Sequence, residues 1–303
     1  MSGFARSLNF TCVRAYDHDE AAELRSVLTL ELHSAVEAFF TNIFRLKRLQ
    51  QFPADLAVVT MEWSRTLMMV ENGDIEASDD SEVESAFRQR ILQRYPSQDH
   101  PNTALVGSSE LLFVIDQTGD RFGLGLHAIL TAQVIGVWTA CEVLFGDLWE
   151  KALNCHPKKL AQLEGMGISK QQAPTIPLWA LGNNGFDVSK CMGTLLRDKV
   201  TFTSIGAAAD AYKKAFPDDA VNSVMASDSL KHLAALRNVL VHKSGKADKE
   251  FKDAVASHPA MSIIAIGETI KVSAEIVQAT VAPAIEATLE LIRAVDNWIV
   301  ANP

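Results

Sequence analysis

The chain has 303 residues, a hydrophobic fraction of 48% and a formal net charge of −9 at pH 7. A chain of this length and apolar content can bury a sizeable core in one large domain or two ordinary ones, which excludes a disordered protein. The acidic balance argues against a protein that binds nucleic acid over its whole surface, because neutralising phosphates requires clustered Lys and Arg.

Acidic and basic residues are unevenly distributed along the chain. Residues 71–85 hold seven acidic side chains and no basic one, so the rest of the chain carries about −2. An acidic run of this kind is typical of a solvated loop. Residues 231–252 hold six Lys or Arg against two acids, a local charge of about +4, and this basic turn could equally be an ordinary solvated one.

The N-terminal region, residues 1–105, is predicted to be helical. Apolar residues recur every three or four positions over residues 17–51, which indicates one long helix ended by Phe52-Pro53. Two further helices are expected over residues 54–70 and 82–95. The turn-rich sequence YPSQDHPNT that follows is the candidate domain boundary.

Residues 106–303 are predicted to form a second helical domain. Its most apolar helical pattern, residues 126–154, has no formal charge before Glu142, so most of its circumference should be buried. Further helices are expected over residues 193–197, 204–216, 228–243, 248–257 and 272–301. Alternation over residues 262–273 indicates a short β-hairpin. The predicted fold class is therefore all-α, a helical bundle with at most a minor β-hairpin.

The sequence favours a cytoplasmic protein that does not contact a membrane. The four cysteines form no CxxC pair, so neither a zinc ribbon nor a dithiol redox motif is supported, and reduced thiols are expected. The first twenty residues lack the apolar core of a signal peptide. The uncharged stretch 122–141 is interrupted by polar residues and glycines, which favours a buried helix over a membrane span.

Common cofactor and metal motifs are not matched. GMGISK at residues 165–170 lacks the spacing of a phosphate loop, and FGLGLH around Gly125 lacks the third glycine of a dinucleotide site. DHDE at residues 17–20 is better suited to capping a helix than to binding a metal. We therefore expect neither a cofactor nor a metal ion.

The stretch LAALRNVLVHKSGKAD, residues 233–248, places polar chemistry on an otherwise amphipathic helix. Asn238 and His242 are four positions apart and share one face, and the long side chain of Arg237 can reach the same place. Histidine exchanges a proton near neutrality, and arginine can hold a phosphate with two parallel hydrogen bonds. Such a set suits attack by a ribose 2′-hydroxyl on its own phosphodiester without a metal. The alternative is an ordinary solvated face.

The segment LRNVLVHKSGKAD resembles the signature of the HEPN superfamily (higher eukaryotes and prokaryotes nucleotide-binding domains). That signature is an Arg, a polar residue that is often Asn, and then a His on a late helix, and Arg237, Asn238 and His242 match it. Three other segments are similar to family elements in the same order: residues 138–153, 200–216 and 264–277. The resemblance covers about residues 108–303.

This resemblance implies a helical domain that often dimerises, so that two Arg-His motifs meet in one cleft. It implies a catalytic set of Arg237, Asn238, His242 and Glu142, the last in the place of the family's frequent acidic residue. A carboxylate in a nearly apolar helix needs a partner, and Arg237 is the expected one. Many members are metal-independent endoribonucleases in toxin, antiviral or RNA-processing systems. We therefore expect an RNA substrate, a homodimer and an antitoxin partner. Members without the catalytic pair are non-enzymatic interaction modules, which is the alternative function.

Lys243, Lys246 and Lys249 follow the motif and are the candidate substrate-binding residues. They could follow an RNA backbone, or they could solvate a helix end where cations suit the helix dipole. Both interpretations remain open from the sequence.

Four tryptophans could stack on bases. Trp138, Trp149 and Trp298 lie in apolar helical patterns and are expected in the core. Trp179 lies in a proline-rich connection and is left open. His232 is expected to be an ordinary surface residue.

Overall fold

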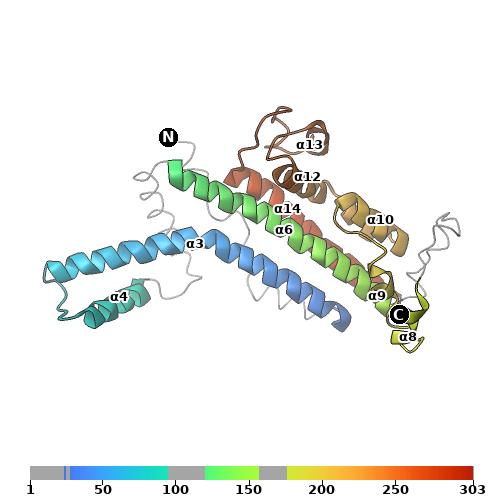
Figure 1. The fold of residues 1–303 in the computed structure, drawn as a ribbon, viewed down its shortest axis with the longest axis horizontal. Coiled ribbons are helices and arrows are strands. Elements are labelled where there is room, and N and C mark those ends of the chain that lie inside the picture. The colour runs from blue at the N-terminus through green and yellow to red at the C-terminus, as the bar shows by residue number, and fades with distance from the viewer. Residues whose placement is uncertain (1–23, 25–27, 95–119, 157–175, 303) are drawn as a thin grey trace.

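The computed structural model describes residue 24 and residues 28–94, 120–156 and 176–302 (Figure 1). Within these residues every regular element is a helix, which confirms the all-α prediction. The elements are η1 (Leu30–Leu32), α3 (His33–Glu71), α4 (Asp80–Arg94), α6 (Asp120–Cys155), α8 (Leu178–Asn183), α9 (Met192–Arg197), α10 (Ile205–Ala215), α11 (Asp219–Met225), α12 (Asp228–His242), α13 (Lys249–Ala254) and α14 (Ala274–Ala301).

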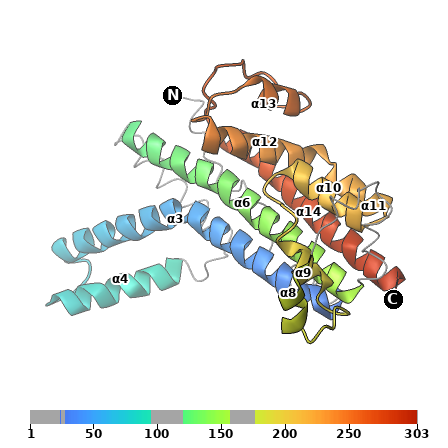
Figure 2. The same ribbon diagram turned by 45° about the vertical axis from the view of Figure 1, so that its right-hand side comes forward.

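Helix α6 lies at the centre of the bundle. Helices α3, α9, α12 and α14 all pack against it, and Figure 2 shows α3 along one side and α14 with α12 along the other. Within the described residues, α6 includes the one helix, Leu124–Cys155, that is long and apolar enough to cross a membrane. Packing by the neighbouring helices buries one side of α6, but Leu124 near its start and Val143 in its middle are exposed, so the prediction that most of its circumference is buried holds only in part.

The three tryptophans that were expected in the core are confirmed there. Trp138, Trp149 and Trp298 are buried, whereas Trp179 on α8 is 70% exposed. The indole nitrogen of Trp149 donates a hydrogen bond to the carbonyl of Ala211 at 3.1 Å, which ties α10 to α6. Buried indole N–H groups of this kind normally find such an acceptor.

Helix α3 does not end at Phe52-Pro53, so that prediction is wrong. The helix continues through Pro53 to Glu71, and Figure 1 shows its two halves running in different directions. A proline inside a helix removes one backbone hydrogen bond and often bends the helix instead of ending it. The first half packs along α6 and shares its core, so hydrophobic packing is continuous between the two predicted regions. The candidate boundary itself lies outside the described residues.

The second half of α3 and the antiparallel α4 form a projecting arm. Glu62 on α3 is buried and pairs with Arg65 at 2.8 Å and with Arg90 of α4 at 3.3 Å. The rings of Trp63 and Phe87 meet edge to face at 5.2 Å. One face of α3 nevertheless presents an exposed apolar stripe, with spacings of three and four residues: Leu49, Phe52, Leu56, Val59, Trp63 and Leu67.

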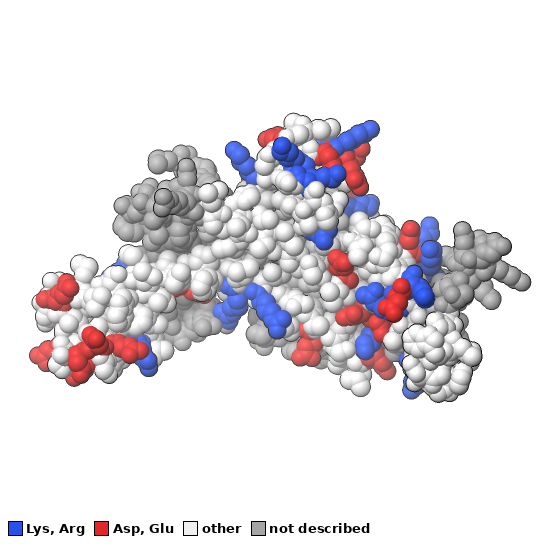
Figure 3. All heavy atoms as spheres, viewed as in Figure 1, with Lys and Arg blue, Asp and Glu red and all other residues white. Residues whose placement is uncertain are grey.

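The acidic run at residues 71–85 is only partly the loop that was expected. Its last six residues form the first turns of α4, and Asp79 Oδ1 accepts a hydrogen bond from the backbone N–H of Glu82 at 3.0 Å. Acidic residues stabilise the start of a helix through its dipole, which explains how so acidic a segment becomes helical. Figure 3 shows these side chains gathered at the tip of the arm.

The β-hairpin expected over residues 262–273 does not form. An isolated antiparallel bridge between Lys246 and Thr269 takes its place within the described residues. The backbone of this segment bonds to the turn after α12: Gly267 N donates to Ala247 O at 2.7 Å and Ile270 N to Gly245 O at 2.8 Å. Residues 262–273 therefore pair with the turn that follows α12 and do not form a hairpin.

Candidate functional site

The predicted motif lies on α12, as expected. Leu233, Leu236 and Val239 form its buried face, whereas Arg237 and Asn238 are half-buried on the other side. The last residue of the helix is His242, which is exposed. The helix thus presents its polar residues from a rigid, well-packed element, which is how a functional site is held in a fixed geometry.

Two left-handed residues reverse the chain directly after His242. Ser244 has a φ of 53° and Gly245 a φ of 74°, and the backbone N–H of Gly245 donates to the carbonyl of Val239 at 3.1 Å. Glycine adopts this conformation without strain, and it commonly terminates helices in this way. The reversal leaves the imidazole of His242 at an open helix end.

Arg237 and His242 contact one another. Arg237 Nη1 lies 3.2 Å from His242 Nε2. A guanidinium group can only donate hydrogen bonds, so His242 Nε2 must be the acceptor, and the imidazole in this arrangement is neutral with its proton on Nδ1. The structure therefore brings together a proton-accepting nitrogen and a fixed positive charge, the two chemical functions that the motif predicted.

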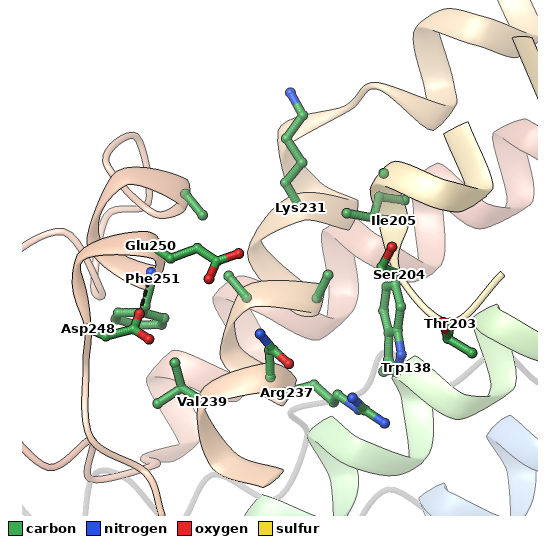
Figure 4. A pocket seen from close by; sticks show the side chains of 15 residues that line it. Trp138, Thr203, Ser204, Ile205, Lys231, Arg237, Val239, Asp248, Glu250 and Phe251 are labelled. Carbon is green, nitrogen blue, oxygen red and sulfur yellow. Dashed lines mark hydrogen bonds between the residues drawn. The ribbon is translucent and has the colours of Figure 1, made fainter. Parts of the chain in front are cut away.

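A pocket of about 370 Å³ lies beside α12 (Figure 4). Arg237 and Asn238 line it from α12, and Trp138 lines it from α6. The remaining walls come from the start of α10, residues 203–206, and from the start of α13, which contributes Glu250. His242 is not among the lining residues. Arg237 is thus the residue that links the pocket to the histidine.

Glu142 does not pair with Arg237, contrary to the prediction. Within the described part of the chain, no ion pair or hydrogen bond joins the two side chains. Glu142 is half-buried one turn beyond Trp138 and lines a neighbouring pocket of about 340 Å³. Thr203 contributes to the walls of both pockets, and Arg237 is turned toward His242 instead. Glu142 therefore has no direct role in positioning the arginine.

The three lysines after the motif are all exposed. Lys243 caps α12 and lies 3.6 Å from Asp248, so it suits the negative end of the helix dipole. Lys249 is the first residue of α13, where the dipole disfavours a cation. The dipole explanation therefore fits Lys243 and not Lys249.

A contact between two histidines, His232 and His258, was not predicted from the sequence. His258 is 1% exposed, and its ring lies edge to face with that of His232 at 5.0 Å. The Nδ1 atom of His258 accepts hydrogen bonds from the backbone N–H groups of Ala260 at 3.2 Å and Met261 at 3.1 Å. Its Nε2 lies 3.1 Å from Thr280 Oγ1. Because Nδ1 already accepts two bonds, a proton there would break both.

His232 is buried too, so the expectation of a surface residue is wrong. Its Nε2 lies 3.1 Å from Ser257 Oγ, and Ser257 donates to Asp228 Oδ2 at 3.2 Å. Burial lowers the pKa of His232, against the opposing effect of Asp228, and the charge of Lys231 lowers it further. Burial also lowers the pKa of His258, as does the neighbouring His232. These rings stabilise the fold in their neutral form.

The free energy of unfolding is expected to fall as the pH falls below about 6.5, the ordinary pKa of histidine. The folded-state pKa values of His232 and His258 lie below their unfolded values, so the unfolded chain binds protons that the native chain does not. The decrease in the free energy of unfolding is absent above about pH 7.5. Below that pH it amounts to at most about 1.4 kcal/mol per pH unit for each histidine.

Urea unfolding at several pH values between about 5.5 and 7.5 measures this slope. The matched variant His258→Gln should be less stable at the upper end of the range, where it loses the buried contacts, but should lose less stability on acidification. A variant whose slope equals that of the wild type would show that His258 is not responsible.

Comparisons with known proteins do not identify a function for this site. No family model, no curated protein and no solved structure matches the chain.

Proposed function

We propose that the protein is a metal-independent endoribonuclease with a HEPN-like catalytic motif. The observation that carries the proposal is the 3.2 Å contact between the exposed His242 and Arg237, which itself lines a pocket. Surface Arg and His residues on helices are usually separate and solvated. Here the arginine contacts the histidine and also lines the pocket, an arrangement that suits acid–base chemistry on a phosphate.

The proposed reaction is an internal transesterification of RNA. When Arg237 turns from His242 Nε2 to the phosphate, that nitrogen becomes free to accept the proton of a ribose 2′-hydroxyl, whose oxygen forms a bond to the adjacent phosphorus. The bond from phosphorus to the 5′-oxygen of the next nucleotide breaks, and that oxygen takes up a proton from water, while His242 returns its extra proton to water. The products are a 2′,3′-cyclic phosphate and a 5′-hydroxyl. Arg237 stabilises the negative charge that develops on the phosphoryl oxygens, and Asn238 orients the substrate from the same helix face.

The direct test is cleavage of end-labelled single-stranded RNAs of varied sequence by the purified protein. Cleavage is expected to continue in EDTA, because no step is assigned to a metal ion. Failure of the wild-type protein to cut any RNA in such a panel would overturn the proposal.

We further propose that the protein acts as a homodimer in which two copies of His242 approach one another. Exposed apolar side chains at the end of α12 and on the adjoining segment support such a contact: Val241, Ile263 and Ile266, exposed by 42%, 82% and 61%. The bridge between Lys246 and Thr269 holds these two segments together. A surface of this kind is typical of an interface.

Light scattering is expected to give a dimer mass at micromolar concentration. The charge-introducing variant Ile263→Asp should give a monomer, whereas Ile263→Thr should shift the equilibrium less. A wild-type protein that stays monomeric would contradict the dimer proposal without affecting the chemistry of one motif.

Within this proposal the protein is a cytoplasmic toxin or defence effector that an antitoxin keeps inactive. An endoribonuclease without narrow sequence preference would harm its own cell, which is why a partner is expected. Co-expression of a neighbouring gene that relieves growth arrest tests this.

The second candidate function is a non-enzymatic interaction module. The apolar stripe on α3 favours it, because six large apolar side chains at helical spacing are exposed by 37–59%. A stripe with this spacing fits the apolar face of another helix. A protein that cuts no RNA, but loses a cellular function when Leu56 and Val59 are changed to Ser, would favour this function over the ribonuclease.

A further inference from the structure

Two hydrogen-bond donors on side chains that line the pocket beside α12 have no acceptor among the described residues. Trp138 is 1% exposed, yet its Nε1 atom finds no hydrogen-bond partner within the described part of the chain. The Nε atom of Arg237 is also buried and has no hydrogen-bond partner among the described residues. Figure 4 shows the two groups at the end of the pocket where α10 begins, near Thr203 and Ser204. Buried donors without an acceptor are rare, because each carries a desolvation cost.

The first turn of α10 adds further donors at the same end. Ser204 caps the helix, and its hydroxyl oxygen accepts from the N–H of Ala207 at 3.2 Å. The N–H groups of Ile205 and Gly206 come earlier and have no acceptor within the helix. A Cβ added to Gly206 would meet nothing within 4 Å, so a ligand can approach this backbone closely. The positive end of the helix dipole favours an anion there.

The opposite end of the pocket offers a hydrogen-bond acceptor. Glu250 of α13 is exposed, and Figure 4 shows its carboxylate pointing toward α12. Asp248 is already engaged, because its Oδ1 accepts from Phe251 N at 2.9 Å and it faces Lys243. One end of the pocket thus suits an anion and the other a group that donates hydrogen bonds. A volume of about 370 Å³ is at the size of a small-ligand site.

We propose that this pocket binds one nucleotide of an RNA strand, with its phosphate over the first turn of α10. Trp138 Nε1, Arg237 and the N–H groups of Ile205 and Gly206 surround the phosphate, and Glu250 accepts from the ribose or the base. The identity of the ligand as RNA rests on the proposed ribonuclease function, whereas the phosphate site does not. Arg237 reaches both the pocket and His242, so the site would place the next phosphodiester at the histidine.

The sharpest test uses Gly206→Asp with Gly206→Asn as its neutral counterpart. Both side chains enter open space, and an acidic residue in the first turn stabilises a helix, so neither variant should lower the Tm. The probes are a 2′-O-methylated RNA pentanucleotide, which offers no 2′-hydroxyl for attack, together with 3′-AMP and adenosine. Binding is measured by calorimetry.

The wild type is expected to bind the pentanucleotide and 3′-AMP more tightly than adenosine. Gly206→Asp should weaken binding of both phosphates at least tenfold, and Gly206→Asn should weaken it less. His242→Ala should leave binding of 3′-AMP within twofold, because this probe fills the pocket without reaching the histidine, and this separates the site from the cleavage chemistry. Equal binding by Gly206→Asp and the wild type would overturn the phosphate site. Binding of 3′-AMP without the pentanucleotide would overturn RNA as the occupant and identify a free nucleotide.

Discussion

Replacement of His242 by alanine is expected to lower the rate of RNA cleavage by about 10²–10⁴-fold, the usual effect of removing a general acid or base. The imidazole is exposed at the end of α12, so its removal opens no cavity in the core. The Tm and the circular dichroism spectrum should therefore stay close to those of the wild type. Rates are compared under single-turnover conditions with one labelled RNA.

The control is a histidine-to-glutamine substitution made at two exposed histidines, His242 and His127. In His242→Gln the amide oxygen can still accept the hydrogen bond of Arg237 but cannot transfer a proton at neutral pH, so activity should fall nearly as far as in His242→Ala. His127 lies exposed on α6, where its Nε2 accepts from Val272 N at 3.2 Å. His127→Gln keeps an acceptor there and should retain wild-type activity. A His242→Gln variant as active as His127→Gln would exclude His242 as a catalytic residue.

Replacement of Gly193 by alanine is expected to lower the free energy of unfolding by about 1–3 kcal/mol, the usual cost of overpacking a tight contact. A Cβ at this position would lie 2.1 Å from the backbone oxygen of Glu150, so α9 would have to move away from α6. Such a shift would disturb the two hydrogen bonds between Asn154 and Thr194, at 3.0 and 3.1 Å. Urea denaturation measures the change.

Gly125→Ala is the matched comparison, since both glycines lie within helices. A Cβ on Gly125 would meet nothing within 4 Å, so alanine should raise the free energy of unfolding by about 0.5–1 kcal/mol through its better helix propensity. If Gly193→Ala were as stable as Gly125→Ala, the close approach of α9 to α6 would be wrong.

Helical periodicity predicted the parts of the fold that depend on one segment alone. The buried face of α12 follows from Leu233 and Leu236 at three-residue spacing, and the burial of Trp138 and Trp149 follows from the apolar pattern around them. The proximity of Arg237 and His242 could be predicted from helical spacing as well, because both residues lie on one helix.

The features that the sequence did not predict depend on contacts between distant segments. Proline disfavours a helix interior, yet Pro53 lies within α3, where tertiary packing on both sides outweighs the lost hydrogen bond. Glu142 lines a pocket that the connection before α10 forms against α6, and no single segment predicts this placement. His258 looked unremarkable because its environment comes from Thr280 and His232, on two separate helices. No spacing rule in one sequence carries this information.

The central claim, 2′-hydroxyl attack at the Arg237–His242 motif, is tested most directly by analysing the products of a substrate with one scissile ribose. A DNA strand carrying a single ribonucleotide is incubated with the wild-type protein in EDTA, beside the same strand with a 2′-O-methyl group at that position. The account predicts cleavage of the first strand only, with a 2′,3′-cyclic phosphate on one fragment and a 5′-hydroxyl on the other. Cleavage of the methylated strand, or a 5′-phosphate on the product, would contradict it.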